Sequence, residues 1–329
     1  MSEAQPTSER MTLFDPVREN LLRVQETLRR SSVVEQFPML ANMLDHILDF
    51  GGKHMRPGIT LLCSKFAPCD AGPPVLMATA VELLHIATLV HDDTIDKANV
   101  RRGRPTVSTL WGKDVAVLLG DYVFAKSATY VCDTGDVRVI RRFAETIMAL
   151  ASGELQEYLS TFDASQTLEQ YYRRIDDKTA SLFTIASESG GMLAGLPEGP
   201  VDALRRYGHN LGMAYQVVDD LLDFEGDEEV VGKPVGSDLR QGVMTLPAIL
   251  FRDRYTKDTS LAEAMAAKGE EAAVERAVTK IRQSRVLAEA RRTAEGFAAK
   301  AQAALGEMPE GAPRRSLGAL TEYVLARKR

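Results

Sequence analysis

Apolar residues recur at intervals of three and four along most of the chain, the spacing that gathers side chains on one face of an α-helix. The intervening residues are rich in Ala, Leu, Glu and Arg, which favour helices, and we find no convincing strand. Glycine and proline pairs separate the segments. We predict helices over residues 14–30, 34–50, 55–66, 75–91, 115–131, 137–160, 168–196 and 201–224, with further helices across 261–305 and a short one after Pro313.

Composition narrows the class of protein. The 329 residues are 45% apolar and 26% charged, as in ordinary globular proteins, and we expect one all-α domain over residues 1–329 with 1–12 as a mobile tail. A net charge of −6 argues against a protein that coats nucleic acid.

The N-terminus lacks a signal-peptide pattern and no uncharged stretch is long enough to span a membrane, so we expect a cytoplasmic protein. Cys63, Cys69 and Cys132 form no CxxC pair and are predicted to be buried structural thiols.

Two copies of the motif D-D-x-x-D follow apolar helical segments. On a helix, residues four apart share a face, so Asp92 lies beside Asp96, and Asp219 beside Asp223. Like charges at a helix C-terminus destabilise it, and a solvated acidic face is the simple alternative to a ligand site. Mg²⁺ would compensate this repulsion, because it takes one or two carboxylates and completes its shell with water and phosphate oxygens. The motifs therefore predict magnesium-bound phosphate, with Asp93 and Asp220 as the remaining members.

Basic residues stand beside glycines or beside the aspartate motifs, where they could hold a diphosphate. Each of them alone could equally be a solvated surface charge. His85, among apolar residues, is either a core histidine or a hydrogen-bond donor to phosphate. The chain has no phosphate-binding P-loop, no GxGxxG after a strand and no Ser/His/Asp pattern. The basic candidates are Lys53, Arg56, Arg101, Arg102, Lys178 and Lys233.

The segments GGKHMRP, ELLHIATLVHDDTIDKANVRRGRPT, DDKTASLF and YQVVDDLLDFEGDEEVVGKPVGSDLRQGVMTLP resemble the trans-isoprenyl diphosphate synthases, from about residue 20 to at least 255. The resemblance implies an all-α single-domain bundle around a deep central cavity, acting as a homodimer. It also implies about three Mg²⁺ ions per active site when substrate is bound. The substrates would be isopentenyl diphosphate and an allylic diphosphate, which join head to tail.

By the same resemblance, Asp92, Asp96, Asp219 and Asp223 bind the metal, and Asp93 and Asp220 assist. The positions that match the allylic diphosphate site are Arg101, Lys178, Thr179, Gln216 and Lys233; those that match the isopentenyl diphosphate site are Lys53, Arg56, His85 and Arg102. His54 stands where many members carry arginine.

Small residues precede the first motif by one helical turn. Ala87 and Thr88 should project into the tunnel beneath the site, where short-chain members place an aromatic residue. We therefore predict a long-chain polyprenyl product. The alternatives are a geranylgeranyl or farnesyl diphosphate synthase, a terpene cyclase or a non-catalytic partner subunit, but a cyclase generally lacks the second motif and a partner subunit tends to lose aspartates. A catalytic chain that needs a small partner remains open.

Overall fold

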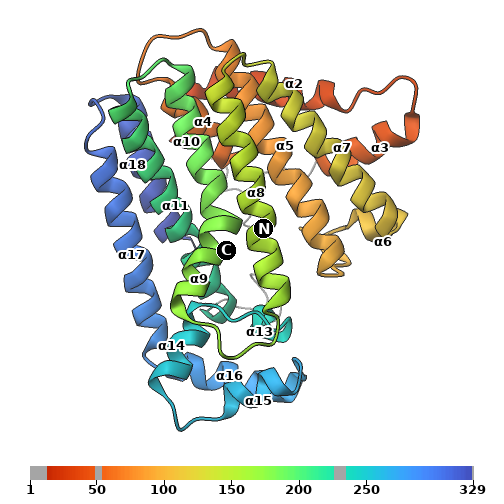
Figure 1. Cartoon of the computed structure of the whole chain (residues 1–329), viewed down its shortest axis with the longest axis vertical. Helices are drawn as coiled ribbons and strands as arrows, with labels where there is room; N and C mark the ends of the chain where they lie inside the picture. Colours follow the sequence, from red (N-terminus) through yellow and green to blue (C-terminus); the bar gives the residue numbers. More distant parts are fainter. Residues whose placement is uncertain (1–12, 49–53, 226–234, 328–329) are drawn as a thin grey trace, which may run out of the picture. The chain divides into compact units, whose positions relative to one another are not determined.

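The computed structural model describes residues 13–48, 54–225 and 235–327, most of which are helical (Figure 1). Contacts within the chain define two compact units. The first comprises Met1–Ala144, Ile185–Arg205 and Glu307–Leu317, and the second comprises Glu145–Thr184, Arg206–Gly306 and Gly318–Arg329. The predicted tail, Lys53 and Lys233 lie outside the described residues.

The first unit is built on a long apolar helix, α5 (Gly72–Ile95). Its first turn holds the two prolines of GPP, which suit a helix N-terminus because their missing N–H groups would have no helical acceptor there. Helix α5 packs chiefly against α7, and also against α4 and α2. Within α5 the side chains of Val81, Leu83 and Leu84 are buried. The helices that begin in this unit are η1 (Asp15–Val17), α2 (Arg18–Ser31), α3 (Pro38–Leu48), α4 (Met55–Ser64), α5 (Gly72–Ile95), α6 (Val107–Trp111), α7 (Lys113–Cys132), α8 (Val137–Leu159), α11 (Glu198–Glu225) and α18 (Ala312–Leu325).

A short hairpin follows α5. Its strands β1 (Val100–Arg101) and β2 (Arg104–Pro105) pair antiparallel, and Arg102 and Gly103 between them both have positive φ angles, of 51° and 77°. Positive φ at both central residues is the signature of the type I′ turn, whose twist matches that of paired strands. The expectation of no strand was therefore wrong at this point.

The second unit packs around Tyr171, Val217, Phe224, Leu246 and Ile281, all fully buried. A π-helix interrupts the segment predicted as one helix over residues 168–196. The elements that begin here are α9 (Leu168–Ile175), the π-helix η2 (Asp176–Ala180), α10 (Ser181–Leu193), α13 (Ser237–Arg240), α14 (Leu246–Arg254), α15 (Ser260–Ala266), α16 (Glu271–Gln283) and α17 (Val286–Leu305).

Two further expectations need correction. Helix α5 does not end before the first aspartate motif but runs through it to Ile95. Cys63 is buried as predicted, whereas Cys69 and Cys132 are exposed and all three thiols are free. The distinction arises because Cys63 lies inside the packed helix α4, while Cys69 follows that helix in a connection and Cys132 ends α7.

Helices α5 and α7 are long and apolar enough to cross a membrane by length and composition alone. The most apolar window of α5 is 67% buried within the protein, as expected of a core helix, and that of α7 is 33% buried. Helix α7 accordingly exposes apolar side chains, among them Val117 and Leu118.

Candidate active site

The first aspartate motif forms the last turn of α5. Asp96 is the C-terminal cap of this helix, and its backbone N–H donates to the carbonyl of Asp92 at 2.8 Å. Asp93 is buried, and the Nε–H of Arg101 lies 2.7 and 2.8 Å from its two carboxylate oxygens. The middle aspartate, Asp93, therefore forms an internal ion pair with Arg101. Of the other two, Asp92 is half-buried and Asp96 is exposed.

The Asp93–Arg101 pair also anchors the hairpin to the end of α5. The hydroxyl of Thr106, just after β2, donates to the carbonyl of Ala98 at 2.7 Å and ties the two ends of the hairpin together. Arg102, at the first central position of the turn, is exposed. The stretch between the helices predicted over 75–91 and 115–131 therefore contains an ordered hairpin, which places Arg101 on Asp93 and Arg102 next to it in the turn.

His85 lies on α5 seven residues before Asp92. Burial lowers the pKa of its imidazole well below 6.5, and the positive charges of Arg56, Arg102 and Arg101 lower it further. The structure thus brings these four predicted residues into one electrostatic group within the first unit. His85 is neutral at pH 7, so it can donate one hydrogen bond without adding to the positive charge.

His54, the departure from the family pattern, caps the N-terminus of α4 in a left-handed conformation with φ of 44°. Its Nδ1 lies 3.3 Å from a carboxylate oxygen of Glu82, which is buried on α5. Nδ1 of His54 is buried and makes no hydrogen bond among the described residues, so the two side chains approach each other without a defined hydrogen bond. This contact links the start of α4, which carries Arg56, to the helix that carries the first motif.

The second motif lies near the end of α11. Asp220 is buried and accepts hydrogen bonds from the Tyr171 hydroxyl at 2.6 Å and from Nε2 of Gln216 at 2.8 Å. Thr179 in turn donates to Oε1 of Gln216 at 2.6 Å. Burial raises the pKa of Asp220 to about 6, although the two hydrogen bonds act in the opposite direction. The predicted residues Thr179, Gln216 and Asp220 therefore form one continuous hydrogen-bonded chain.

Asp223 organises the segment that follows α11. Its carboxylate accepts from the backbone N–H groups of Ser237 at 3.0 Å and Asp238 at 3.2 Å, and so caps α13. Burial raises the pKa of Asp238 well above 3.8, and the charges of Asp223 and Asp220 raise it further. Carboxyl groups are crowded at this point, and a bound cation would offset the repulsion between their negative charges.

Arg327 supplies a positive charge to the second motif. Its Nη2 lies 3.1 Å from a carboxylate oxygen of Asp219, and its guanidinium stacks over the ring of Tyr215 at 4.1 Å from the centroid. Sequence reasoning missed Arg327, Tyr171 and Asp238. Only the G-S-D sequence beside the second motif offered a signal for Asp238, because the other two residues are brought in by tertiary folding.

Lys178 lies on the π-helix η2. Its Nζ is 2.7 Å from Glu154 and 2.5 Å from Glu157, both on α8, so it is paired with two carboxylates. Gly153 of α8 permits this approach, because a Cβ there would lie 2.7 Å from the backbone nitrogen of Lys178. π-Helical turns are rare and are often found at functional sites.

The carboxylates fit a hard divalent cation. Among the described residues no group of three His, Cys, Asp or Glu side chains could hold a metal by itself. Mg²⁺ does not require such a group, since it uses one or two carboxylates with water and substrate phosphates. In both motifs the middle aspartate is buried with internal partners, and the first aspartate is more accessible.

The chain-length candidates differ in their surroundings. Ala87 is fully buried, whereas Thr88 is half-buried and its hydroxyl donates to the carbonyl of His85 at 2.8 Å. This hydroxyl is therefore satisfied by its own helix, and the side chain presents its methyl group to the surroundings.

Comparison with known proteins identifies the family. The polyprenyl synthetase family matches residues 37–281. A prenyl transferase of Synechocystis sp. is 36% identical over 96% of this chain and 98% of its own length. Heptaprenyl diphosphate synthase component 2 of Geobacillus stearothermophilus is 40% identical over 72% of this chain and 74% of its own length. The crystal structure of a decaprenyl diphosphate synthase from Rhodobacter capsulatus superimposes with a TM-score of 0.91 at 33% identity, covering 97% of this chain and 99% of that one. The chain therefore belongs to the polyprenyl synthetase family and is a prenyl-transferring enzyme.

Proposed function

We propose that the enzyme condenses isopentenyl diphosphate with an allylic diphosphate, head to tail and with trans geometry, to make a long-chain polyprenyl diphosphate. The main observation behind this proposal is that the two aspartate motifs have the same arrangement. In each, a buried middle aspartate is fixed by hydrogen bonds, from Arg101 in one case and from Tyr171 and Gln216 in the other. The long product is supported by the relatives named as heptaprenyl and decaprenyl diphosphate synthases.

Mg²⁺, about three ions per site, is the metal we propose. Asp92 and Asp96 would hold it at the first motif, and Asp219 and Asp223 at the second. When bound, it would neutralise the leaving diphosphate. Asp93 and Asp220 would position the motifs rather than carry metal, because each already has internal partners. Arg327 would release Asp219 when the metal binds.

The basic residues would bind and orient the substrates. Arg101, Lys178, Thr179, Gln216 and Lys233 would hold the allylic diphosphate, and Lys53, Arg56, His85 and Arg102 the isopentenyl diphosphate. Neutral His85 would donate its N–H to a phosphate oxygen. Lys178 would exchange Glu154 and Glu157 for phosphate. No protein nucleophile is required: the allylic C–O bond breaks to release diphosphate, the double bond of isopentenyl diphosphate attacks the allylic cation, and a proton is then lost, to the released diphosphate in our proposal.

The test is incubation of the purified chain with Mg²⁺, farnesyl diphosphate and radiolabelled isopentenyl diphosphate, followed by dephosphorylation and sizing of the alcohols. We expect a ladder that extends beyond about twenty carbons, which requires a deep apolar pocket. A ladder that stops at twenty carbons would contradict the long-chain assignment and identify a geranylgeranyl diphosphate synthase. Cyclic hydrocarbons would identify a terpene cyclase.

We expect Ala87→Phe to shorten the product by several isoprene units, because an aromatic ring one turn before the motif would close the path of the growing chain. The same sizing assay measures the change. Ala87 is fully buried, so the larger side chain also costs about 1–3 kcal/mol of stability, and thermal unfolding of the variant must be followed in parallel. Thr88→Phe, at a half-buried position, is the companion variant. An unchanged ladder from both folded variants would contradict the assignment.

We propose that the enzyme acts as a homodimer. Exposed apolar side chains on α7 and α8 support this, among them Leu118 with 68% of its surface exposed and Leu159 with 80%. One relative is called component 2 of its synthase, so the need for a second protein must be tested directly. Light scattering on the purified chain gives the assembly, and turnover by that chain alone shows that no other subunit is needed.

A further inference from the structure

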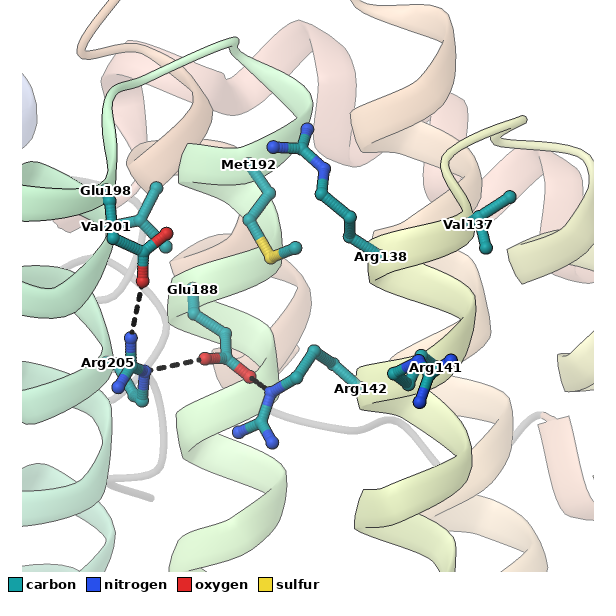
Figure 2. Close-up of a pocket in the computed structure, with 9 residues that line it drawn as sticks. All are labelled: Val137, Arg138, Arg141, Arg142, Glu188, Met192, Glu198, Val201 and Arg205. Carbon is teal, nitrogen blue, oxygen red and sulfur yellow. Dashed lines mark hydrogen bonds and ion pairs between the residues drawn. The ribbon is translucent and has the colours of Figure 1, made fainter.

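A cavity of about 440 Å³ opens between the start of α8, the end of α10 and the start of α11, all within the first unit (Figure 2). None of the residues that line it belongs to the aspartate motifs or to the predicted basic set. Its wall instead carries four arginines of its own: Arg138, Arg141, Arg142 and Arg205. The proposed reaction gives this cavity no role.

An arginine–glutamate–arginine triad forms one side of the cavity. Glu188 of α10 is 2% exposed, and its two oxygens accept from Nε of Arg142 at 2.8 Å and Nε of Arg205 at 3.1 Å. Figure 2 shows the two guanidinium groups approaching this carboxylate from α8 and α11. The buried carboxylate is therefore neutralised, and it fixes two positive groups in place.

The other two arginines, Arg138 and Arg141, are not engaged by Glu188. Arg138 pairs with Asp136 at 2.7 Å, but its side chain stays 66% exposed. Arg141 is exposed, and its side chain has no ion pair or hydrogen bond among residues 13–48, 54–225 and 235–327. Four arginines and two glutamates line the cavity, and Asp136 and Asp202 beside the lining pair with Arg138 and Arg205. Within the part of the chain that the structure describes, Arg141 is therefore the lining arginine whose charge no carboxylate neutralises, and it faces the cavity beside the exposed Arg138. A cation or a wholly apolar ligand would not match these walls.

We propose that this cavity binds a phosphate-bearing small molecule at a site separate from the substrate-binding residues. Arg138 and Arg141 would contact the phosphate oxygens, because a guanidinium presents paired N–H donors that match them. The Arg142–Glu188–Arg205 triad, in which Arg205 also pairs with Glu198 and Asp202, would supply a rigid polar wall. Met192 and the buried Val201 provide an apolar surface for the rest of the ligand. The phosphate could belong to a free anion or to a lipid headgroup, and these two sources share the same chemistry.

The first arm of the test is calorimetric titration of the full chain with inorganic diphosphate in EDTA, which removes the divalent metal that the aspartate motifs would need. We expect the double variant Arg138→Ala/Arg141→Ala to weaken one binding event by roughly a hundredfold, about tenfold for each charged donor lost. Arg29→Ala is the matched control, because it removes an exposed arginine of the same unit outside the cavity. The control should bind like the wild type.

A second variant is expected to raise the affinity for the anion instead of lowering it. Glu188→Gln removes the negative charge from the wall while keeping the side-chain shape, so we expect it to bind the anion several-fold more tightly. Mere loss of folding would weaken binding in every variant and would not produce this gain. The thermal unfolding of all variants provides the check.

The second arm uses vesicles of phosphatidylcholine with or without phosphatidic acid, whose headgroup is a phosphate monoester. Cosedimentation that depends on phosphatidic acid and is lost in the Arg138/Arg141 double variant supports the proposal with a lipid as the source. Arginine-dependent binding of inorganic diphosphate supports it with a free anion. Binding of both probes that is indifferent to these arginines, or no binding at all, overturns it.

Discussion

Asp92→Asn should lower kcat/KM for isopentenyl diphosphate incorporation by about 10²–10³-fold, the usual effect of removing one preorganised electrostatic group from an active site. Asparagine keeps the shape of the side chain but loses the charge that a hard cation requires. Asp92 lies one turn from Asp96 on α5, while Asp93 is occupied by Arg101, so no neighbouring carboxylate can replace it. The radiolabel assay, repeated over a range of Mg²⁺ concentrations, measures this effect.

Asp133→Asn is the matched control for this variant. Asp133 is an exposed aspartate at the C-terminal end of α7 in the same unit, and its replacement makes the same change of charge. We expect its activity to equal that of the wild type. Full activity in Asp92→Asn at ordinary Mg²⁺ concentrations would remove Asp92 from the metal site and weaken the proposed function.

Gly153→Ala should lower the free energy of unfolding by roughly 1–3 kcal/mol, as overpacking in a close contact generally does. The added Cβ would lie 2.7 Å from the backbone nitrogen of Lys178, and backbone cannot rotate away as a side chain can. The π-helix η2 must therefore shift, and with it Lys178 and Thr179. Activity should fall together with stability, which thermal unfolding and the radiolabel assay measure on the same samples.

Gly296→Ala is the control, since this glycine has open space around it. Gly296 lies in the middle of α17, is exposed, and would have no atom within 4 Å of an added Cβ. Alanine is the better helix former, so this variant should be more stable by about 0.5–1 kcal/mol. If both substitutions changed the free energy of unfolding equally, the close contact between Gly153 and the π-helix would not contribute to stability.

Helical periodicity was sufficient to predict most of the fold. The long helices α7, α8 and α11 follow the predicted spans closely, because each has a long run of apolar residues and clear glycine or proline boundaries. The hairpin at residues 100–105 was missed, since a strand of two residues is too short to show alternation. The π-helix was missed as well, because an extra residue in one turn leaves the apolar pattern on either side intact.

The residues of the candidate site also fall into those that the sequence pattern identified and those that it missed. The aspartate motifs were chosen from the sequence, as were Thr179, Gln216 and Asp220, which the structure joins by hydrogen bonds. Tyr171 and Arg327 could not be found by spacing, since Tyr171 lies 49 residues from Asp220 and Arg327 lies 108 residues from Asp219. Such partners are set by tertiary packing. The metal-binding and substrate-binding roles remain predictions that the variants above examine.

The π-helix at Asp176–Ala180 has an evolutionary consequence. A π-turn closes hydrogen bonds between residues five apart, so it accommodates one more residue than the α-helical turn it replaces. Such a turn corresponds to the insertion of a single codon into an ordinary helix. Relative to an uninterrupted α-helix, an insertion of this kind rotates Lys178 and Thr179, while α9 before it and α10 after it keep their α-helical hydrogen bonds. The two side chains at this turn are among those that we propose to bind the allylic diphosphate, so a single added residue bears on two predicted contacts at once.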